Sequence, residues 1–328
     1  MSTQHSVAQN EALTAQFAVD VQYYLAQQPR QLPSHYFYDA LGSALFDAIC
    51  RLPWYRITRA ELRLLAVHGR DIWRHAAFDT IVELGGGSGE KLVTLLAMRI
   101  DAGRPASTSI DVHLIDVSAS ALAQSAGALG GLGRVHVVTH QAPYEVGLAE
   151  AGVARASAGG TLTLFLGSNI GNFDPPGADA FLVGIRSALT RGDAFLIGAD
   201  LVKPERELLL AYDDPLGVTA AFNRNLLVRI NRELGGDFDV NAFSHRACWN
   251  GDASRVEMHL VGRRRQRVRV PAAELELEFN EGESIWTESS YKYQPDGVVR
   301  MLERAGFGLL EQWVDPDAGF ALTLVEAL

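Results

Sequence analysis

The residues best suited to chemistry begin with a glycine-rich segment at residues 82–91, Val-Glu-Leu-Gly-Gly-Gly-Ser-Gly-Glu-Lys. The segment follows a short apolar run that is typical of a strand, and it opens a run with helical spacing. Glycines at such a turn permit a tight bend and let a ligand approach the backbone closely. The helix that follows offers unpaired N–H groups at its start, so the segment predicts a cofactor site.

The spacing of the glycines separates the classes of cofactor. Counted from Gly85, the last glycine of the dinucleotide pattern G-x-G-x-x-G would fall on Glu90. The phosphate-loop pattern needs a glycine before its lysine, but Lys91 follows Glu90. An acid such as Glu83, two residues before the first glycine, is common in methyltransferase turns. The segment therefore favours a methyltransferase over a nicotinamide-dependent enzyme.

Polar side chains also follow the next two apolar runs. Asp116 ends the second run, where a carboxylate can accept two O–H bonds from a ribose diol, and Ser118 is expected to cap the next helix. Gln141 ends the third run, where its amide oxygen could accept from the amino group of adenine. His140, beside it, is expected in a surface loop.

These residues need a sheet to position them. Short apolar runs at 80–84, 112–115, 135–138, 162–166 and 195–197 alternate with segments of helical spacing. Near-continuous apolar strands separated by helices are typical of a parallel sheet covered on both faces. The pattern predicts a doubly wound α/β domain. Ligands of such sheets lie outside the carboxyl ends of the strands, where Asn172 is also expected.

After residue 200 the pattern changes. Residues 256–261 and 268–270 predict a hairpin, and Leu275, Leu277 and Phe279 follow with period two. Helical spacing is found at residues 12–28, 39–51 and 204–234, the last interrupted by Asp-Asp-Pro.

The sheet pattern resumes at 308–314 and 321–325. We therefore predict an α/β fold: a Rossmann-like core with an inserted α+β substrate-binding lobe and a ligand cleft between them. The core would comprise residues 60–200 and 287–328, and the lobe residues 1–59 and 201–286.

Composition narrows the classes of partner. The 328 residues carry a formal net charge of −10, so a nucleic-acid backbone is repelled on average. The basic run at 263–269 alternates with valines like a charged edge strand. We expect no signal peptide, because the first residues lack a basic segment followed by an apolar core, and no stretch of the ~18 apolar residues that span a bilayer occurs in the sequence. We expect a cytoplasmic, monomeric protein that acts on a small molecule, without nucleic-acid or membrane partners.

The two cysteines, Cys50 and Cys248, lie far apart in the sequence. No CxxC or HExxH pattern is present, so we expect buried, reduced thiols and no metal site.

Longer segments carry a resemblance to a known family. They are YFYDALGS (36–43), LPWY (52–55), TRAE (58–61), FLGSNIGN (165–172), YDD (212–214), GVTAAFN (217–223) and TESS (287–290). Several long segments in the correct order are far more specific than a glycine turn. Over almost its whole length the chain resembles the L-histidine Nα-methyltransferases of ergothioneine biosynthesis, a histidine-specific family that depends on S-adenosyl-L-methionine (SAM).

The resemblance implies stepwise methylation of the α-amine of histidine to its trimethyl betaine, hercynine. S-adenosylhomocysteine would be released at each step. By position in the family's segments, Gly85, Lys91 and Asp116 would hold SAM, and Gln141 would lie at the adenine.

The resemblance also implies a set of substrate-binding residues. They would hold the carboxylate and amine (Tyr55, Asn172, Tyr212), lie beside the accepting amine (Tyr38), bind the imidazole (Glu288, Ser290) or pack near it (Met258). Tyr38 and Asn172 would act closest to the chemistry.

These residue types suit methylation of an amine. The amine must be neutral to attack, and phenols and amides around it do not stabilise the ammonium form as a carboxylate would. Glu288 can accept from an imidazole N–H. Ser290, two residues on, points to the same side if the segment is extended.

Three departures from the family leave alternatives open. Gln141-Ala142 replaces an acidic–aromatic pair, Asn169 stands where relatives often have Thr, and Trp286 is bulkier than the usual aliphatic residue. The alternative substrates are a thiohistidine derivative and a tryptophan-like amino acid. From other classes, a nicotinamide-dependent oxidoreductase and a methyltransferase-like binding protein without turnover stay open.

Overall fold

The computed structural model describes residues 2–75, 78–101, 109–154 and 159–328. Its contacts divide the chain into two compact units. The core unit comprises Cys50–Pro204, Ala253–Arg255 and Ser290–Leu328. The insert unit comprises Met1–Ile49, Glu205–Asp252 and Val256–Ser289.

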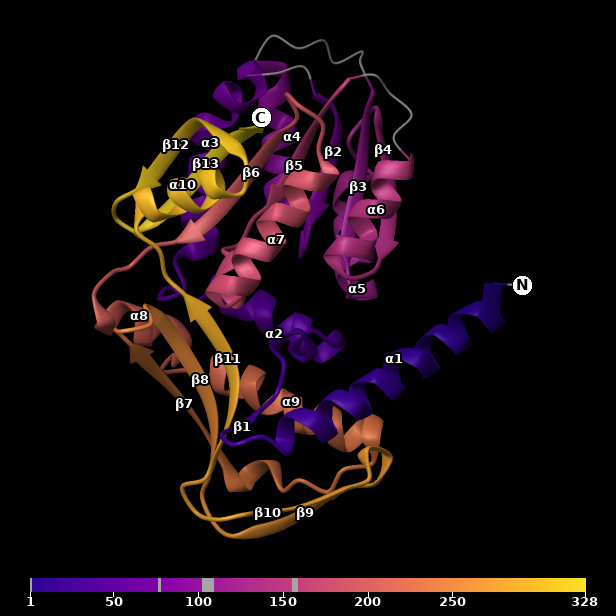
Figure 1. Ribbon diagram of the computed structural model, residues 1–328, viewed down its shortest axis with the longest axis vertical. Coiled ribbons are helices and arrows are strands. Elements are labelled where there is room, and N and C mark those ends of the chain that lie inside the picture. The colour runs from indigo at the N-terminus through magenta and orange to yellow at the C-terminus, as the bar shows by residue number, and fades with distance from the viewer. Residues whose placement is uncertain (1, 76–77, 102–108, 155–158) are drawn as a thin grey trace. The chain divides into compact units, whose positions relative to one another are not determined.

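The core unit is built on a seven-stranded sheet with the order β12-β13-β6-β5-β2-β3-β4 (Figure 1). The strands from β2 to β6 pair in parallel, whereas β13 runs antiparallel to both β6 and β12. The predicted parallel sheet is confirmed. Its strands are β2 (Phe78–Leu84), β3 (Ile110–Asp116), β4 (Val135–Gln141), β5 (Gly160–Phe165), β6 (Ala194–Asp200), β12 (Phe307–Asp315) and β13 (Phe320–Ala327).

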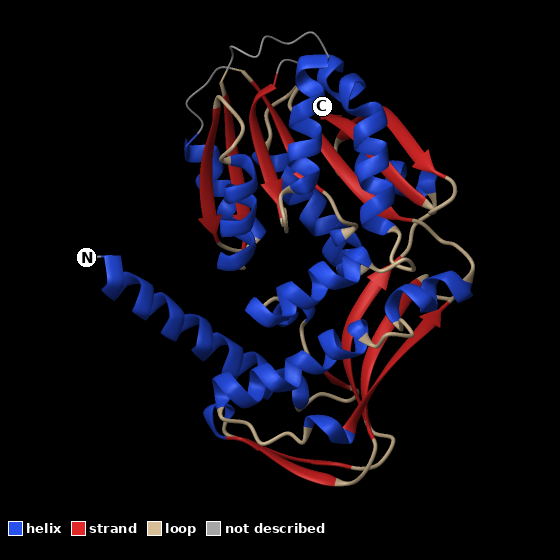
Figure 2. Ribbon diagram, turned by 180° about the vertical axis from the view of Figure 1, so that it is seen from behind, coloured by secondary structure: helices blue, strands red, loops and turns tan. Residues whose placement is uncertain are grey.

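Helices cover both faces of this sheet, as in a doubly wound domain (Figures 1 and 2). One face carries α3 (Ile57–His75), α4 (Glu90–Asp101) and α5 (Ala119–Leu129), and the other carries α6 (Tyr144–Ala154), α7 (Pro175–Ala188) and α10 (Pro295–Arg304). Every residue of β6 is buried, because a central strand between two helical layers has no face toward water.

The insert unit contains helices and two small sheets. Its helices are α1 (Ser2–Leu25), α2 (Ala40–Arg51), α8 (Glu205–Tyr212) and α9 (Val218–Leu234), of which α2 ends in the core unit. A four-stranded sheet has the order β1-β11-β8-β7, from β1 (Arg30–Gln31), β11 (Ser284–Tyr291), β8 (Arg255–Gly262) and β7 (Phe243–Asn250). A separate pair joins β9 (Gln266–Val270) to β10 (Leu275–Phe279).

The predicted hairpin between residues 256–261 and 268–270 is wrong. β8 lies between β11 and β7, and β9 pairs with β10 instead. The chain leaves the larger sheet at Gly262, whose N–H donates to the Glu283 carbonyl, and the next N–H, on Arg263, donates to Ala242. A Cβ at Gly262 would lie 2.9 Å from the Asn280 carbonyl oxygen, so this crossing needs a glycine.

The prediction of a charged strand in the basic run is confirmed in part. From Gln266 onward the basic run forms β9, in which Arg267 and Arg269 are exposed while Val268 and Val270 are buried; Arg263, Arg264 and Arg265 precede the strand. Among the described residues neither cysteine forms a disulfide, but both are half-buried rather than buried as expected. No helix within the described ranges has both the length and the apolar character needed to cross a bilayer.

The interruption predicted between the two helices around residue 214 is also present. Asp214, buried between α8 and α9, accepts hydrogen bonds from the N–H groups of Leu216, Val218 and Thr219 at 3.0, 3.2 and 2.7 Å. Two of these donors open α9 and have no partner inside the helix. Burial alone would raise the pKa of Asp214, but these N–H donors outweigh it and lower the pKa.

We predict that Asp214→Ala lowers the free energy of unfolding by about 2 kcal/mol, because it strands N–H groups at a buried helix start. Asp214→Asn should lose less, since its amide oxygen can still accept. Because the folded pKa is depressed, the wild-type advantage is present above the unfolded pKa and disappears as the pH falls through the folded one. Urea unfolding of both variants at pH 7 and at acidic pH measures this, and equal stability of Asp214→Ala and wild type would refute it.

Candidate active site

The glycine-rich turn after β2 has the backbone that the sequence predicts for a ligand cradle. Gly85, Gly87 and Gly89 have φ of 69°, 59° and 76°, a region that side-chain-bearing residues rarely adopt. A Cβ on Gly85 would lie 2.8 Å from Tyr144 Oη, whereas one on Gly87 would meet nothing within 4 Å. The turn therefore has free space beside Gly87, whereas Tyr144 fills the space beside Gly85.

Tyr144 is a residue that the sequence analysis missed. Its ring packs edge-on against Phe165 and Phe181, with centroids 5.5 and 5.8 Å apart, and burial raises the pKa of its phenol. It opens α6, three residues after Gln141, where an aromatic residue close behind a strand end was the available signal.

Asp116 and Gln141 are register partners at the carboxyl ends of β3 and β4. The Asp116 carboxylate accepts from the Ser118 N–H at 2.8 Å, and Ser118 caps α5 as predicted. Burial raises the pKa of Asp116, although backbone donors act in the opposite direction. Gln141 is exposed and its amide donates to the Val117 carbonyl at 3.4 Å. With Gly85, these residues lie at one edge of the sheet.

His140 contradicts its predicted place in a surface loop. It lies in β4 and is only 9% exposed. One ring nitrogen is 3.0 Å from a ring nitrogen of His113, and the other is 3.0 Å from the Glu150 carboxylate. The strand runs three residues beyond Val138, the last apolar position of the run, so hydropathy alone placed its end too early.

Glu83 is the most unusual ionisable group at this edge. Its side chain is buried, and neither carboxylate oxygen has a hydrogen-bond partner among the described residues. A Cβ on Gly86 would lie 2.4 Å from Glu83 Oε2, so the carboxylate lies directly beneath the turn. Burial raises the pKa of Glu83 to about 7, while Lys91 acts to lower it. A cation bound on the turn would compensate this buried acid.

Lys91 forms an ion pair with the fully buried Glu61, with Nζ 2.8 Å from Oε2. Both oxygens of Glu61 also accept from the Gly167 N–H, at 2.9 and 2.8 Å. Burial acts to lower the pKa of Lys91, but Glu61 outweighs it and the pKa is raised. Lys91 is thus a fixed positive charge that ties α4 to α3 and to the end of β5.

The end of β5 brings two asparagines to the same edge. Gly167 and Ser168 have φ of 82° and 60°, and Ser168 Oγ accepts from the Asp200 N–H at 2.9 Å. The left-handed turn opens a short helix, η2 (Asn169–Asn172). A Cβ on Gly85 would lie 3.0 Å from Asn169 Nδ2, so Asn169 is next to the cofactor turn.

A buried charged network surrounds Ser290 in the core unit. Lys292 Nζ donates to Ser290 Oγ at 2.8 Å and lies 3.0 Å from Asp200 Oδ2. Asp200 also pairs with Lys203 at 2.6 Å. Ser290 Oγ would be 3.5 Å from a Cβ on Gly171, directly before Asn172. The sequence analysis missed Lys292 and Asp200, although Lys292 continues the alternation of Glu288 and Ser290.

The predicted substrate residues are divided between the two units. Tyr55, Asn172 and Ser290 belong to the core unit, and Tyr38, Tyr212, Met258 and Glu288 to the insert unit. The extended conformation expected for Glu288 and Ser290 is confirmed, because both lie in β11.

Within the insert unit, aromatic rings and backbone contacts hold these side chains. Tyr38 packs edge-on against Phe46 and Phe222, with centroids 5.6 and 5.8 Å apart. The carbonyl of the buried Tyr212 lies 2.8 Å from a ring nitrogen of His245. Met258 is buried, and its carbonyl accepts from Thr287 Oγ1 at 3.0 Å.

A parallel sheet with a glycine-rich turn after its first parallel strand and an acid at the end of the next defines a Rossmann-like protein that binds an adenosine-bearing cofactor. Glu83 is buried and its carboxylate accepts no hydrogen bond from the described residues, so it fits a cofactor that carries positive charge better than an anionic dinucleotide. The comparisons with known proteins identify the family.

A family model described as "Histidine-specific methyltransferase, SAM-dependent" matches residues 17–327. The chain belongs to this family, and its cofactor is therefore SAM. Histidine N-alpha-methyltransferases from Mycolicibacterium smegmatis and Mycobacterium tuberculosis are each 42% identical over 306 residues, which is 93% of this chain and 93% of each relative. Ergothioneine biosynthesis protein 1 of Schizosaccharomyces pombe is 26% identical over 90% of this chain and 39% of its own length.

We predict a pH dependence of stability that Glu83 causes. Its folded pKa of about 7 exceeds the ordinary pKa of 4.5 for a glutamate, so between these values the folded state binds more protons than the unfolded state. The free energy of unfolding should therefore fall as the pH rises through this window, by about 3 kcal/mol from this group. Glu83→Gln should flatten the dependence.

Unfolding of the cofactor-free protein between pH 5 and 8 measures this effect. Glu90→Gln, which removes an exposed acid at the start of α4, is the matched control and should retain the wild-type slope. The assignment fails if Glu83→Gln keeps that slope as well.

Proposed function

We propose that this enzyme methylates the α-amine of L-histidine, in successive steps up to the trimethyl betaine. The observation that supports this most is the 42% identity, over 93% of the chain, to two proteins named histidine N-alpha-methyltransferase. The name of the fission-yeast relative supports a role in ergothioneine biosynthesis.

The residues at the carboxyl edge of the core sheet fit SAM. When bound, SAM supplies an electrophilic methyl carbon on a sulfonium. We propose that Asp116 accepts from the ribose hydroxyls, that Gln141 faces the adenine, and that the turn at Gly85 receives the charged part of the molecule. Lys91, held by Glu61, fixes the helix that follows this turn.

The chain's own residues bind and orient the amino acid. Tyr55, Asn172 and Tyr212 would bind its carboxylate and amine, while Tyr38 would lie beside the nitrogen that is methylated. Phenols and an amide do not stabilise the ammonium form, so they do not disfavour the neutral amine. Alignment of the nitrogen lone pair with the methyl carbon would supply most of the rate enhancement. The released proton would pass to water or through Tyr38.

The imidazole would be bound by Glu288 and Ser290, with Met258 packed near it. Lys292 would make Ser290 the hydrogen-bond donor of this pair. Because its ammonium donates to Ser290 Oγ, the hydroxyl hydrogen of Ser290 is directed elsewhere and can be donated to the unprotonated ring nitrogen. Glu288 would accept from the ring N–H, so together they read a neutral imidazole. Lys292 is in this proposal a positioning residue.

The experiment that tests the function is mass spectrometry of histidine incubated with the enzyme and SAM. We expect mass gains of one, two and three methyl groups with matching release of S-adenosylhomocysteine. Parallel reactions contain tryptophan and a thiohistidine. Faster turnover of either would reassign the substrate to that alternative, and no turnover of any of them would favour a binding protein without activity.

We predict that Lys292→Met raises the KM for histidine about tenfold, a loss of ~1.4 kcal/mol, with a smaller change in kcat and no change in the KM for SAM. The matched control is Lys203→Met, which also removes an ion pair from Asp200 but does not contact Ser290. It should leave the KM for histidine unchanged.

An analogue whose ring carries carbon in place of the second nitrogen separates positioning from general damage. The wild type should bind this analogue more weakly than histidine. Lys292→Met and Ser290→Ala should each bind the analogue and histidine about equally well. If Lys292→Met retains the full preference for histidine over this analogue, Lys292 does not position Ser290.

The number of methyl groups, a monomeric state and a cytoplasmic location stay predictions from the sequence.

A further inference from the structure

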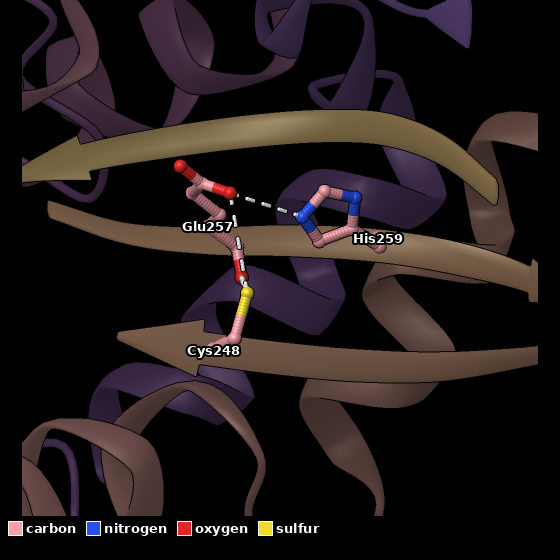
Figure 3. A group of neighbouring side chains, drawn as sticks. All are labelled: Cys248, Glu257 and His259. Carbon is pink, nitrogen blue, oxygen red and sulfur yellow. Dashed lines mark hydrogen bonds and ion pairs between the residues drawn. The ribbon is translucent and has the colours of Figure 1, made fainter. Parts of the chain in front are cut away.

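Three side chains with metal-binding atoms, none of them assigned a role in the proposed methyl transfer, gather on two neighbouring strands of the insert unit. Cys248 lies on β7, and Glu257 and His259 lie on β8, the next strand of the sheet. Figure 3 shows one oxygen of the Glu257 carboxylate joined by dashed lines to both the thiol and the imidazole. One candidate atom from each residue lies within 4.8 Å of the other two.

The distances approach those around a bound ion. His259 Nε2 is 3.3 Å from Glu257 Oε2, and Cys248 Sγ is 4.0 Å from the same oxygen. Around a tetrahedral ion with bonds of about 2.0 to 2.3 Å, neighbouring ligand atoms lie roughly 3.5 Å apart. Rotations of these side chains, without a change in the strands, would therefore suffice to surround an ion.

The chemistry of the three donors is selective. A thiolate, a carboxylate and a neutral imidazole together carry two negative charges, which a divalent cation would neutralise. Sulfur and nitrogen ligands favour zinc and similar ions over magnesium or calcium, which prefer oxygen alone. Three protein ligands leave the fourth position of a tetrahedron to water.

Neighbouring contacts already orient the donors. Asn250 Nδ2 donates to Glu257 Oε1 at 3.0 Å, which leaves Oε2 directed at the other two residues. The Trp286 ring stacks on His259, with centroids 6.1 Å apart and an angle of 27° between the planes. The side chains of His259 and Glu257 are 12% and 14% exposed, so the site is sheltered but accessible. Such supporting contacts are typical of metal sites.

We propose that Cys248, Glu257 and His259 form a binding site for a divalent cation of the zinc type. The donors lie at C-x8-E-x-H, a spacing that matches none of the common zinc patterns. The antiparallel hairpin of β7 and β8 brings them together, and for this reason the sequence predicted no metal site.

The test uses the full-length protein without a histidine tag and Co²⁺ as the probe. We expect binding of one Co²⁺ per chain with a thiolate-to-cobalt charge-transfer band, and displacement of the band by Zn²⁺. Cys248→Ser should abolish the band, and Glu257→Gln and His259→Gln should each weaken Co²⁺ binding by more than about tenfold. Asn250→Ala should weaken it less.

Cys50→Ser is the matched control, because it removes the other cysteine, which lies in the core unit, and it should keep the band. Circular dichroism and metal-free unfolding check that each variant is folded. If Cys248→Ser does not fold, the proposal rests on Glu257→Gln, which preserves the size of the side chain. A wild type without a charge-transfer band, or Co²⁺ binding that is unchanged in folded Cys248→Ser or Glu257→Gln, would overturn it.

Discussion

The buried carboxylate of Glu61 is the interaction on which the cofactor edge of the sheet depends. It pairs with Lys91 of α4 and accepts from the Gly167 N–H after β5. A Cβ on Gly198 would lie 2.0 Å from its Oε1, so β6 has a glycine where the acid packs. A buried charge is tolerated only when it is paired and hydrogen-bonded. Meeting that requirement fixes three segments around one group: the start of α4 after the glycine-rich turn, the turn after β5 and β6 at Gly198.

The same edge holds a second buried acid in the opposite condition. Glu83 has no hydrogen-bond partner among the described residues, whereas both oxygens of Glu61 are satisfied. The two carboxylates also repel each other, which contributes to the raised pKa of Glu83. Glu61 thus stabilises the fold, whereas Glu83 has a buried negative charge that a positively charged ligand can compensate. Strain of this kind is often concentrated at binding sites.

The core unit could be predicted well from the sequence because its strands are buried on both faces. Continuous apolar runs such as residues 195–197 within β6 have no competing interpretation once helical segments flank them. The positions of Asp116 and Gln141 were also predicted, since a polar residue that ends such a run must lie at the carboxyl edge of the sheet. His140 was misplaced because a strand can extend beyond its apolar residues when a histidine pair satisfies its polar end.

The insert unit was less predictable, because pairing between short strands depends on contacts distant in the sequence. The partner of β8 is decided partly where Gly262 and Arg263 bond to Glu283 and Ala242, and no local pattern encodes these bonds. The Lys292–Asp200 pair and the group around Glu257 were missed for the same reason. The substrate residues were assigned from long matching segments, since a tyrosine or asparagine alone carries little information.

β11 has a consequence for how a ring could be recognised. Its residues up to Ser289 belong to the insert unit, and Ser290 and Tyr291 belong to the core unit. Glu288 and Ser290 are therefore assigned to different units, yet one unbroken strand joins them. Their spacing is dictated by covalent geometry, at about 3.3 Å per residue, and not by how side chains pack. A substitution can change the side chain at either position, but only the insertion or deletion of a residue could change the distance between the two positions. A shift of one residue would turn one of the two side chains to the opposite face of the strand.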